Sequence, residues 1–130
     1  MSWFSDIFVA SDADLAAMGV DASNPFGIDL WKMPCQPSVR LPSVNDDGAL
    51  RRLLCELTNW PDEQVTTAMI PLSNIERSYA VCRFTPQFAE AIATSSSNQT
   101  LQQQLIELAR EAARSNKHLC WWWVNSELLK

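Results

Sequence analysis

Hydrophobic residues recur along this chain at a spacing typical of amphipathic helices. Four leucines follow the i, i+3, i+4, i+7 rule and predict a helix near residues 44–58. A second apolar stripe, with Gln, Glu and Arg opposite to it, predicts a helix over residues 101–114. The first stripe consists of Leu50, Leu53, Leu54 and Leu57, and the second of Leu101, Leu105, Leu108, Ala109 and Ala112. Each helix therefore offers one apolar side to a sheet.

The end of the chain combines a strand pattern with very large side chains. Three tryptophans, Trp121, Trp122 and Trp123, follow Cys120 directly. On a strand over residues 118–124, Trp121 and Trp123 face one way, while Cys120 and Trp122 face the other. Because each indole carries roughly 150–250 Å² of mostly apolar surface, both faces need cover. Two arrangements stay open: a central strand packed on both sides, or a strand with helices on one face and a partner on the other.

The remaining elements are predicted from β-branched runs, helix caps and prolines. Further strands are expected over residues 3–9, 28–33, 65–70 and 79–84. Short helices are expected at residues 12–18, opened by a capping box of Ser11 and Asp14, and at 86–94, capped by Thr85. The order β-α-β-α-β-β-α-α-β indicates an α+β fold: a single mixed sheet of about five strands with helices mainly on one face. Residues 1–130 are expected to form one domain.

Charge and cysteine usage narrow the class of protein. The formal net charge is −5, and the nearest approach to a basic cluster is Arg51-Arg52, so nucleic acid is not expected as a partner. No apolar segment is long enough to span a membrane, and no secretory signal pattern is present. The cysteines are Cys35, Cys55, Cys82 and Cys120. A chain of this size needs no disulfide to fold, so we expect a cytoplasmic protein with reduced thiols.

Two segments resemble a loose group of small bacterial hypothetical proteins. The first is Tyr79-Ala-Val-Cys-Arg-Phe-Thr-Pro-Gln-Phe-Ala-Glu-Ala-Ile-Ala, a strand followed by a helix. The second is Leu105-Ile-Glu-Leu-Ala-Arg-Glu-Ala-Ala-Arg, followed after a few polar residues by Leu119-Cys-Trp-Trp-Trp-Val. The similarity covers about the last 50 residues. Because no activity is assigned to the group, the resemblance implies a fold and carries over no site.

The residues that usually carry catalysis are sparse in this chain. His118 is the single histidine, and the cysteines are separated by 20, 27 and 38 positions, so no metal site is expected. His118 and Cys120 share one face of a predicted strand, but their Cβ atoms would lie about 6.5–7 Å apart, too far for an easy hydrogen bond. With only three glycines, no phosphate-binding loop or nucleophile elbow is present. No catalytic residue and no cofactor are therefore predicted.

The sequence favours a non-enzymatic binding or interaction protein. Its acidic charge and small size suit a protein partner, as in an immunity protein that inhibits a basic toxin, or a second copy in a homodimer. The alternative is a small enzyme or ligand-binding domain whose tryptophan-lined pocket uses Asp29, Arg83 or His118. Asp29 is considered because it lies in a predicted strand beside Trp31. The predicted ligand or partner surface comprises Trp121, Trp122, Trp123, His118, Asp29 and Arg83.

Overall fold

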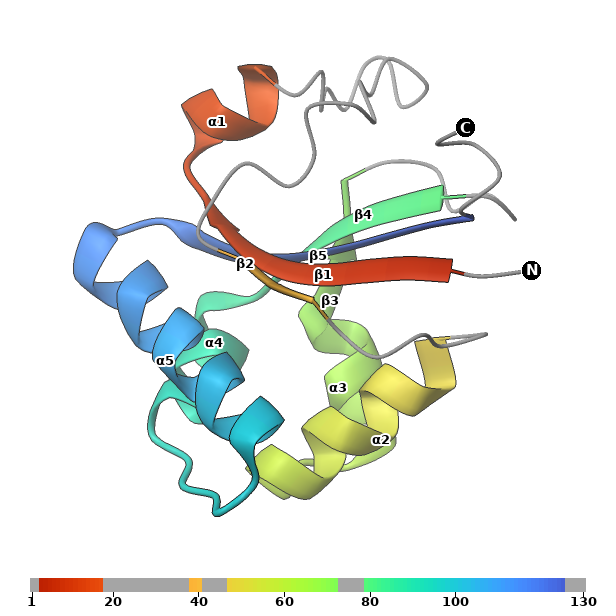
Figure 1. Cartoon of the computed structure of the whole chain (residues 1–130), viewed down its shortest axis with the longest axis vertical. Coiled ribbons are helices and arrows are strands. Elements are labelled where there is room, and N and C mark those ends of the chain that lie inside the picture. Colours follow the sequence, from red (N-terminus) through yellow and green to blue (C-terminus); the bar gives the residue numbers. More distant parts are fainter. Residues whose placement is uncertain (1–2, 18–37, 41–46, 73–78, 126–130) are drawn as a thin grey trace.

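The described part of the chain forms one sheet flanked by helices. The computed structural model describes residues 3–17, 38–40, 47–72 and 79–125. The strands are β1 (Trp3–Ala10), β2 (Ser38–Arg40), β3 (Met69–Pro71), β4 (Tyr79–Phe84) and β5 (His118–Asn125). The helices are α1 (Asp12–Ala17), α2 (Asp47–Thr58), α3 (Asp62–Ala68), α4 (Pro86–Ala93) and α5 (Thr100–Ser115). Helices α2 to α5 lie on one side of the sheet, here called the inner face, and α1 lies on the opposite, outer side (Figure 1).

The strands are ordered β2-β1-β5-β4-β3, which puts β5 in the middle of the sheet. Every described neighbour pair is antiparallel, so the α+β class is confirmed, and the expectation of a mixed sheet is wrong for these strands. The reason lies in the connections. A single crossover helix would return the chain parallel to the strand it left. Here both α4 and α5 intervene between β4 and β5, so the chain leaves the sheet and comes back at the same end, where Arg83 pairs with Cys120.

Local capping signals place several helices as the sequence predicts. The backbone N–H of Asp14 donates to the Ser11 hydroxyl at 3.0 Å, and the Ser11 N–H donates to the Asp14 carboxylate at 2.9 Å. Thr85 accepts a hydrogen bond from the Phe88 N–H at the start of α4, and Pro86 occupies the first turn. Helix α5 ends where Asn116 adopts a left-handed conformation with φ 54°. These caps satisfy backbone groups that a helix end otherwise leaves without partners.

One predicted strand is mostly a helix. Residues 65–70 were expected to be extended because Val65, Thr66 and Thr67 are β-branched. Instead α3 spans Asp62–Ala68, and only the short β3 follows. The Val65 N–H donates to the Pro61 carbonyl, and the Thr66 hydroxyl donates back to the Asp62 carbonyl, so the polar groups of this segment are satisfied within a helix. Val65 and Ala68, three positions apart, form its buried side.

Other predictions fall outside the described residues. They concern the strand at residues 28–33 and most of the proline-rich segment 34–42, of which only residues 38–40 are described, as β2. The start of the predicted helix near 44–58 also lies there, and the described helix α2 begins at Asp47.

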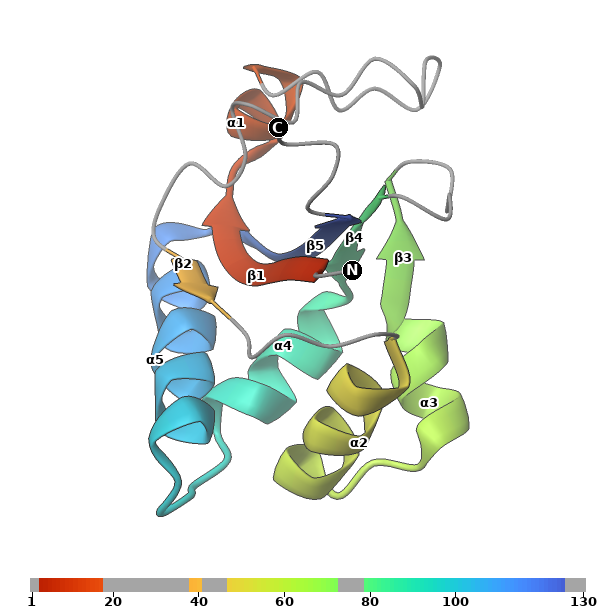
Figure 2. The ribbon, with the colours of Figure 1, turned by 45° about the vertical axis from the view of Figure 1, so that its right-hand side comes forward.

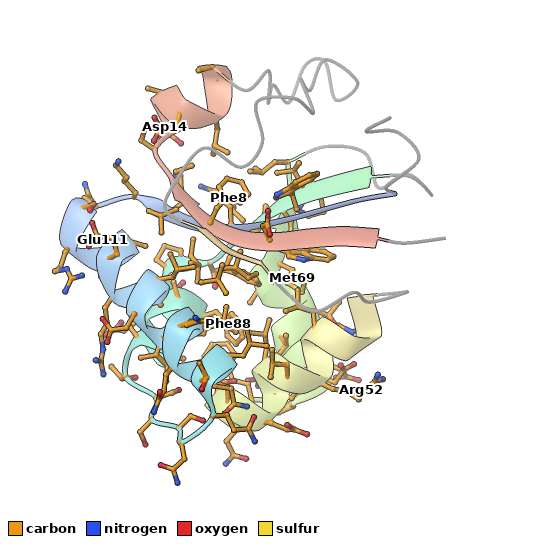
Figure 3. The ribbon with its side chains drawn as sticks, in the orientation of Figure 1. Phe8, Asp14, Arg52, Met69, Phe88 and Glu111 are labelled. Atoms are coloured by element: carbon orange, nitrogen blue, oxygen red, sulfur yellow. The ribbon has the colours of Figure 1, made fainter. Side chains whose placement is uncertain are left out.

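The main core lies between the inner face of the sheet and helices α2 to α5. Strand residues Ile7, Phe84 and Leu119 belong to this core, and the ring of Phe88 packs on Phe84 at a centroid distance of 5.6 Å. Figure 3 shows Phe88 between the sheet and the helices. The predicted leucine stripes supply the helical half of the same core. From these stripes, the buried residues are Leu50, Leu54, Leu57, Leu105, Leu108, Ala109 and Ala112. Burial of apolar surface at about 25 cal/mol per Å² is the main stabilising contribution of this layer.

Candidate functional site

Strand β5 divides its tryptophans between the two faces of the sheet. Trp121 pairs with Ile7 and Cys82 and belongs to the inner core, where it is 4% exposed. Trp122 pairs with Asp6 and Val81 on the outer face and is 2% exposed. Of the two arrangements left open by the sequence, a central strand packed on both sides is the one observed for these two indoles. The side chain of Trp123 lies outside the part that the structure describes.

Three of the predicted surface residues lie together on the outer face. His118 and Trp122 occupy alternate positions of β5 on either side of Cys120, and Arg83 of β4 pairs directly with Cys120. In antiparallel pairing, such diagonal neighbours have a separation of about 7–8 Å. The neighbouring strand β1 adds Asp6 and Phe8. Residues that are distant in sequence thus meet because β4, β5 and β1 are adjacent in the sheet.

Two nitrogen donors of this outer face are buried and have no hydrogen bond to any residue that the structure describes. Neither Nε1 of Trp122 nor Nε of Arg83 has a partner among the residues that the structure describes. A buried donor without an acceptor costs about 1–3 kcal/mol. Asp6, only 2% exposed, is a buried carboxylate on the same face. The outer face therefore carries polar groups that apolar packing alone does not explain.

His118 contacts the first residue of α1. Its Nε2 lies 2.7 Å from Oδ1 of Asp12, and next to it Nζ of Lys117 lies 3.8 Å from the Asp14 carboxylate. Hydrogen bonds from the backbone and hydroxyl of Ser11 lower the pKa of Asp14, with a smaller contribution from Lys117. These two contacts connect the first residues of β5 to the first turn of α1. Since Asp12 is 91% exposed, its contact with His118 contributes at most about 1 kcal/mol.

The cysteines show no sign of nucleophilic chemistry in the described residues. Cys120 is completely buried, Cys82 is buried on the inner face, and no disulfide joins Cys55, Cys82 and Cys120. Burial, and secondly the nearby Asp62 carboxylate, raise the pKa of the partly exposed Cys55 thiol. A raised pKa lowers the population of the reactive thiolate. Cys35 and the candidate Asp29 lie outside the described residues.

No metal site is evident in the described ranges, where no three His, Cys, Asp or Glu side chains gather closely enough to hold an ion. None of the helices described here combines the length and the apolarity needed to cross a bilayer.

A second feature, which the sequence did not predict, is a groove between α5 and β2. Its volume is about 610 Å³, and it is open to solvent. One wall is Val39 of β2, and the other is a stripe of α5 that consists of polar residues and the buried Leu108. The α5 residues are Thr100, Gln103, Gln104, Glu107, Leu108, Glu111 and Arg114. At 1.5 Å per residue, this stripe is about 21 Å long.

The charged groups of the groove are held in place by neighbours on α5. Glu111 accepts hydrogen bonds from Arg114 at 2.7 Å and from the Ser115 hydroxyl at 2.9 Å. These bonds lower the pKa of Glu111, so its carboxylate is ionised at neutral pH. Arg110 donates to Glu107 at 3.1 Å and to the Ala93 carbonyl at 3.0 Å. Figure 3 shows Glu111 on the side of α5 that faces away from the core.

Sequence reasoning assigned no role to the polar side of the helix at 101–114, and it therefore missed this groove. The hydropathy pattern correctly places the polar groove residues opposite the apolar stripe. Nothing in that pattern shows that a sheet edge lies beside them, because β2 is more than 60 positions away in sequence.

No protein-family model, curated protein or solved structure matches the chain.

Proposed function

We propose that this chain is a non-enzymatic protein-binding module whose partner occupies the groove between α5 and β2. The observation that carries the proposal is the groove itself, a recess of about 610 Å³ between a sheet edge and a helix. Such recesses at the edge of a sheet recur in domains that recognise peptide segments. Its amide and carboxylate side chains offer hydrogen bonds, and Leu108 and Val39 offer apolar contact.

The chemistry of the other candidate residues supports binding over catalysis. His118 contacts Asp12, and Cys120 is fully buried, so these two do not form an accessible nucleophile and base. The carboxylates of the groove are paired with arginines on the same helix. These pairs engage both carboxylates in contacts within α5.

The net charge of −5 favours a basic partner. This is the expectation for a cytoplasmic protein that neutralises a basic protein, as immunity proteins do. It also agrees with the proposed membership in a group of small bacterial proteins of unassigned function. Electrostatic complementarity of this kind speeds association and selects the partner.

Charge reversal in the groove tests this function. Immobilised wild type is compared with the double variant Glu107→Lys/Glu111→Lys and with Glu90→Lys, an exposed control on α4, in lysate of the source cells. The proposal expects one partner that both wild type and the control retain and that the double variant loses by at least about tenfold, a difference of about 1.4 kcal/mol. Equal retention by all three chains would exclude the groove as the binding surface.

A second copy of the chain is the other partner that the sequence favours. Because Trp121 and Trp122 are buried within one chain, a homodimer would have to use a different surface from these two indoles. Sedimentation of the wild type at micromolar concentrations tests for the dimer. Retention of any dimer in the groove double variant would place its interface elsewhere.

The alternative function, a small-ligand site, is favoured by one observation on the outer face. The buried donors of Trp122 and Arg83 lie on diagonal positions and have no acceptor among the described residues. Their chemistry suits a carboxylate, which accepts from an arginine and an indole N–H at once. A titration of wild type and Arg83→Lys with small aromatic carboxylates, followed by tryptophan fluorescence, tests this alternative. No saturable change in the wild type would rule it out for that class of ligand.

A further inference from the structure

Helix α1 buries little apolar surface on the outer side of the sheet. It comprises six residues, of which Leu15 is buried, and it follows β1 through the single residue Ser11. Figure 2 shows α1 on the side of the sheet opposite to helices α2 to α5. A short helix with one buried side chain opens more readily than the core of a domain, because little apolar burial opposes the opening. The polar contacts of α1 therefore matter for how firmly it is attached.

The first turn of α1 contacts the start of β5 through two pairs of side chains. Oδ1 of Asp12 lies 2.7 Å from Nε2 of His118, and Oδ2 of Asp14 lies 3.8 Å from Nζ of Lys117. The sheet brings these groups together, because Ala10 at the end of β1 is directly opposite His118. Of the side-chain types aspartate, lysine and histidine, only histidine ordinarily changes its charge between about pH 5 and 8.

We propose that α1 is a proton-sensitive latch, which closes more firmly on β5 when His118 carries a proton and opens more often when it does not. An imidazolium attracts the Asp12 carboxylate by charge as well as by hydrogen bonding, whereas a neutral imidazole offers it a hydrogen bond alone. The inference concerns the outer side of the sheet and does not depend on the groove between α5 and β2.

The other charged groups on the elements around His118 have both signs. Among the described residues, they are the cations Lys117, Arg83 and Arg114 and the carboxylates Asp14, Asp6 and Glu111. Lys117 is adjacent in sequence, and Arg83 of β4 pairs with Cys120, two residues along β5, so these two cations act against a charged imidazole. The carboxylates act in its favour, and that of Glu111 is already paired with Arg114 at 2.7 Å. Because the two signs oppose each other, the direct contact with Asp12 sets the direction of the effect.

The exposure of Asp12 limits the size of the effect. Its side chain is 91% exposed, and ion pairs at such sites are weakened by solvent. We therefore expect the ratio of closed to open α1 to change by at most about fivefold, which is equivalent to about 1 kcal/mol. Added salt should reduce this change, because it screens charges near the surface.

Opening of α1 affects the outer layer of the sheet. Leu15, Phe8 and Cys120 are buried but do not belong to the inner core cluster. Figure 3 shows Phe8 on the side of the sheet that faces α1. Release of α1 withdraws Leu15 from this side, so the latch regulates how readily solvent and solutes reach the outer face.

Hydrogen exchange of the Leu15 amide measures how often the latch opens. This N–H donates to the Ser11 carbonyl at 3.0 Å, so it exchanges when α1 opens. The Ala89 amide, which donates to the Thr85 carbonyl in α4, is the internal reference and shows that the chain is folded. After correction for intrinsic rates, protection of Leu15 should fall by about two- to fivefold from about pH 5 to about pH 8, and protection of Ala89 should not. The fall should follow the titration of His118, observed in the same samples by NMR of its ring protons.

Variants of the contact assign the change to its source. His118→Gln keeps a side-chain N–H that is not titrated in this range, and Asp12→Asn removes the carboxylate, so both should abolish the pH dependence of Leu15 protection. Lys117→Gln is the matched control, because it removes a neighbouring cation and should leave the pH dependence in place. A wild-type Leu15 amide whose protection is absent or does not change with pH would overturn the latch. A change that persists undiminished in His118→Gln, with Ala89 still protected, would overturn it as well.

Discussion

The two faces of the sheet are both buried, yet their chemistry differs. On the inner face, Ile7, Phe84 and Leu119 pack among apolar residues of α2 to α5. On the outer face, the same strands place Phe8 and Trp122 beside the polar groups of Asp6 and Arg83. Successive residues of one strand thus contribute to two layers of different composition.

The two faces therefore contribute differently to the stability of the fold. Apolar burial accounts for the inner face, because every member of that cluster gains by leaving water. Two buried N–H groups that have no partner among the described residues cost stability, so the outer face is where the sequence departs from what packing alone favours. Departures of this kind occur most often at functional sites.

Removing one phenylalanine from each face gives the largest expected effects. Phe88 and Phe8 are both fully buried, so Phe88→Ala and Phe8→Ala should each lower the free energy of unfolding by about 3–5 kcal/mol. Urea denaturation of both variants measures the effect, with the exposed Gln103→Ala as a control near zero. A loss below about 1 kcal/mol for Phe8→Ala alone would mean that the outer face is loosely packed and that the two layers differ in density as well as composition.

Removing a helix cap on either side of the sheet should have a smaller effect on stability, and the effect should differ between α4 and α1. Thr85 caps α4, whose Phe88 and Ile92 are in the main core, so Thr85→Ala should cost about 1 kcal/mol of global stability. Ser11 caps the six-residue α1, where only Leu15 is buried. Ser11→Ala should therefore increase local opening of α1, seen by hydrogen exchange, and change the urea midpoint less than Thr85→Ala does. If Ser11→Ala instead lowered the urea midpoint more than Thr85→Ala, α1 on the outer side would contribute more to global stability than α4.

Replacing the outer indole by a smaller ring tests the donor that has no partner. Trp122→Ala should cost about 3–5 kcal/mol, like other large aromatic truncations in a core. Trp122→Phe should cost no more than about 1 kcal/mol, because loss of the buried N–H offsets much of the lost packing. Chemical denaturation of the two variants measures this difference. A cost of Trp122→Phe near that of Trp122→Ala would show that the indole N–H has an acceptor after all.

The fold was predictable wherever one local signal dominated. Runs of aromatic and β-branched residues predicted β4 and β5, and the leucine stripes predicted α2 and α5, because each of these patterns lies within one short segment of the sequence. The predicted strand at 65–70 was wrong over residues 65–68, because the strand preference of Val65 conflicts with a proline and two acidic residues at a helix start. The burial of Val65 and Ala68 in the core favours the helix, and intrinsic propensity carries no information about such tertiary packing.

The candidate sites were less predictable than the fold. The sequence named His118, Arg83 and Trp122, and the sheet brings these three to one face, but their proximity depends on the order of strands that are distant in sequence. The buried carboxylate of Asp6 was missed for the same reason. The groove depends on β2 and α5 lying side by side, a relation that no local pattern expresses.

The smallest expected effect is a dependence of stability on pH at the contact between α1 and β5. Hydrogen bonds from Ser11, and secondly Lys117, hold the pKa of Asp14 below its usual value of about 3.9. A lowered folded-state pKa adds stability that is fully present above the unfolded value and is lost as the pH falls through the folded value. The difference in melting temperature between wild type and Asp14→Asn should therefore be largest near neutral pH and disappear as the pH falls through the lowered pKa of the folded state. Because Asp14 is 41% exposed, solvent should keep this difference small, and added salt should reduce the part due to Lys117. The variant Glu111→Gln is the matched comparison: Arg114 and Ser115 also lower the pKa of that carboxylate, but Glu111 lies on α5 and not at the contact between α1 and β5. A difference between wild type and Asp14→Asn that stays constant from pH 7 to pH 2 would show that the Asp14 side chain stabilises α1 without its charge.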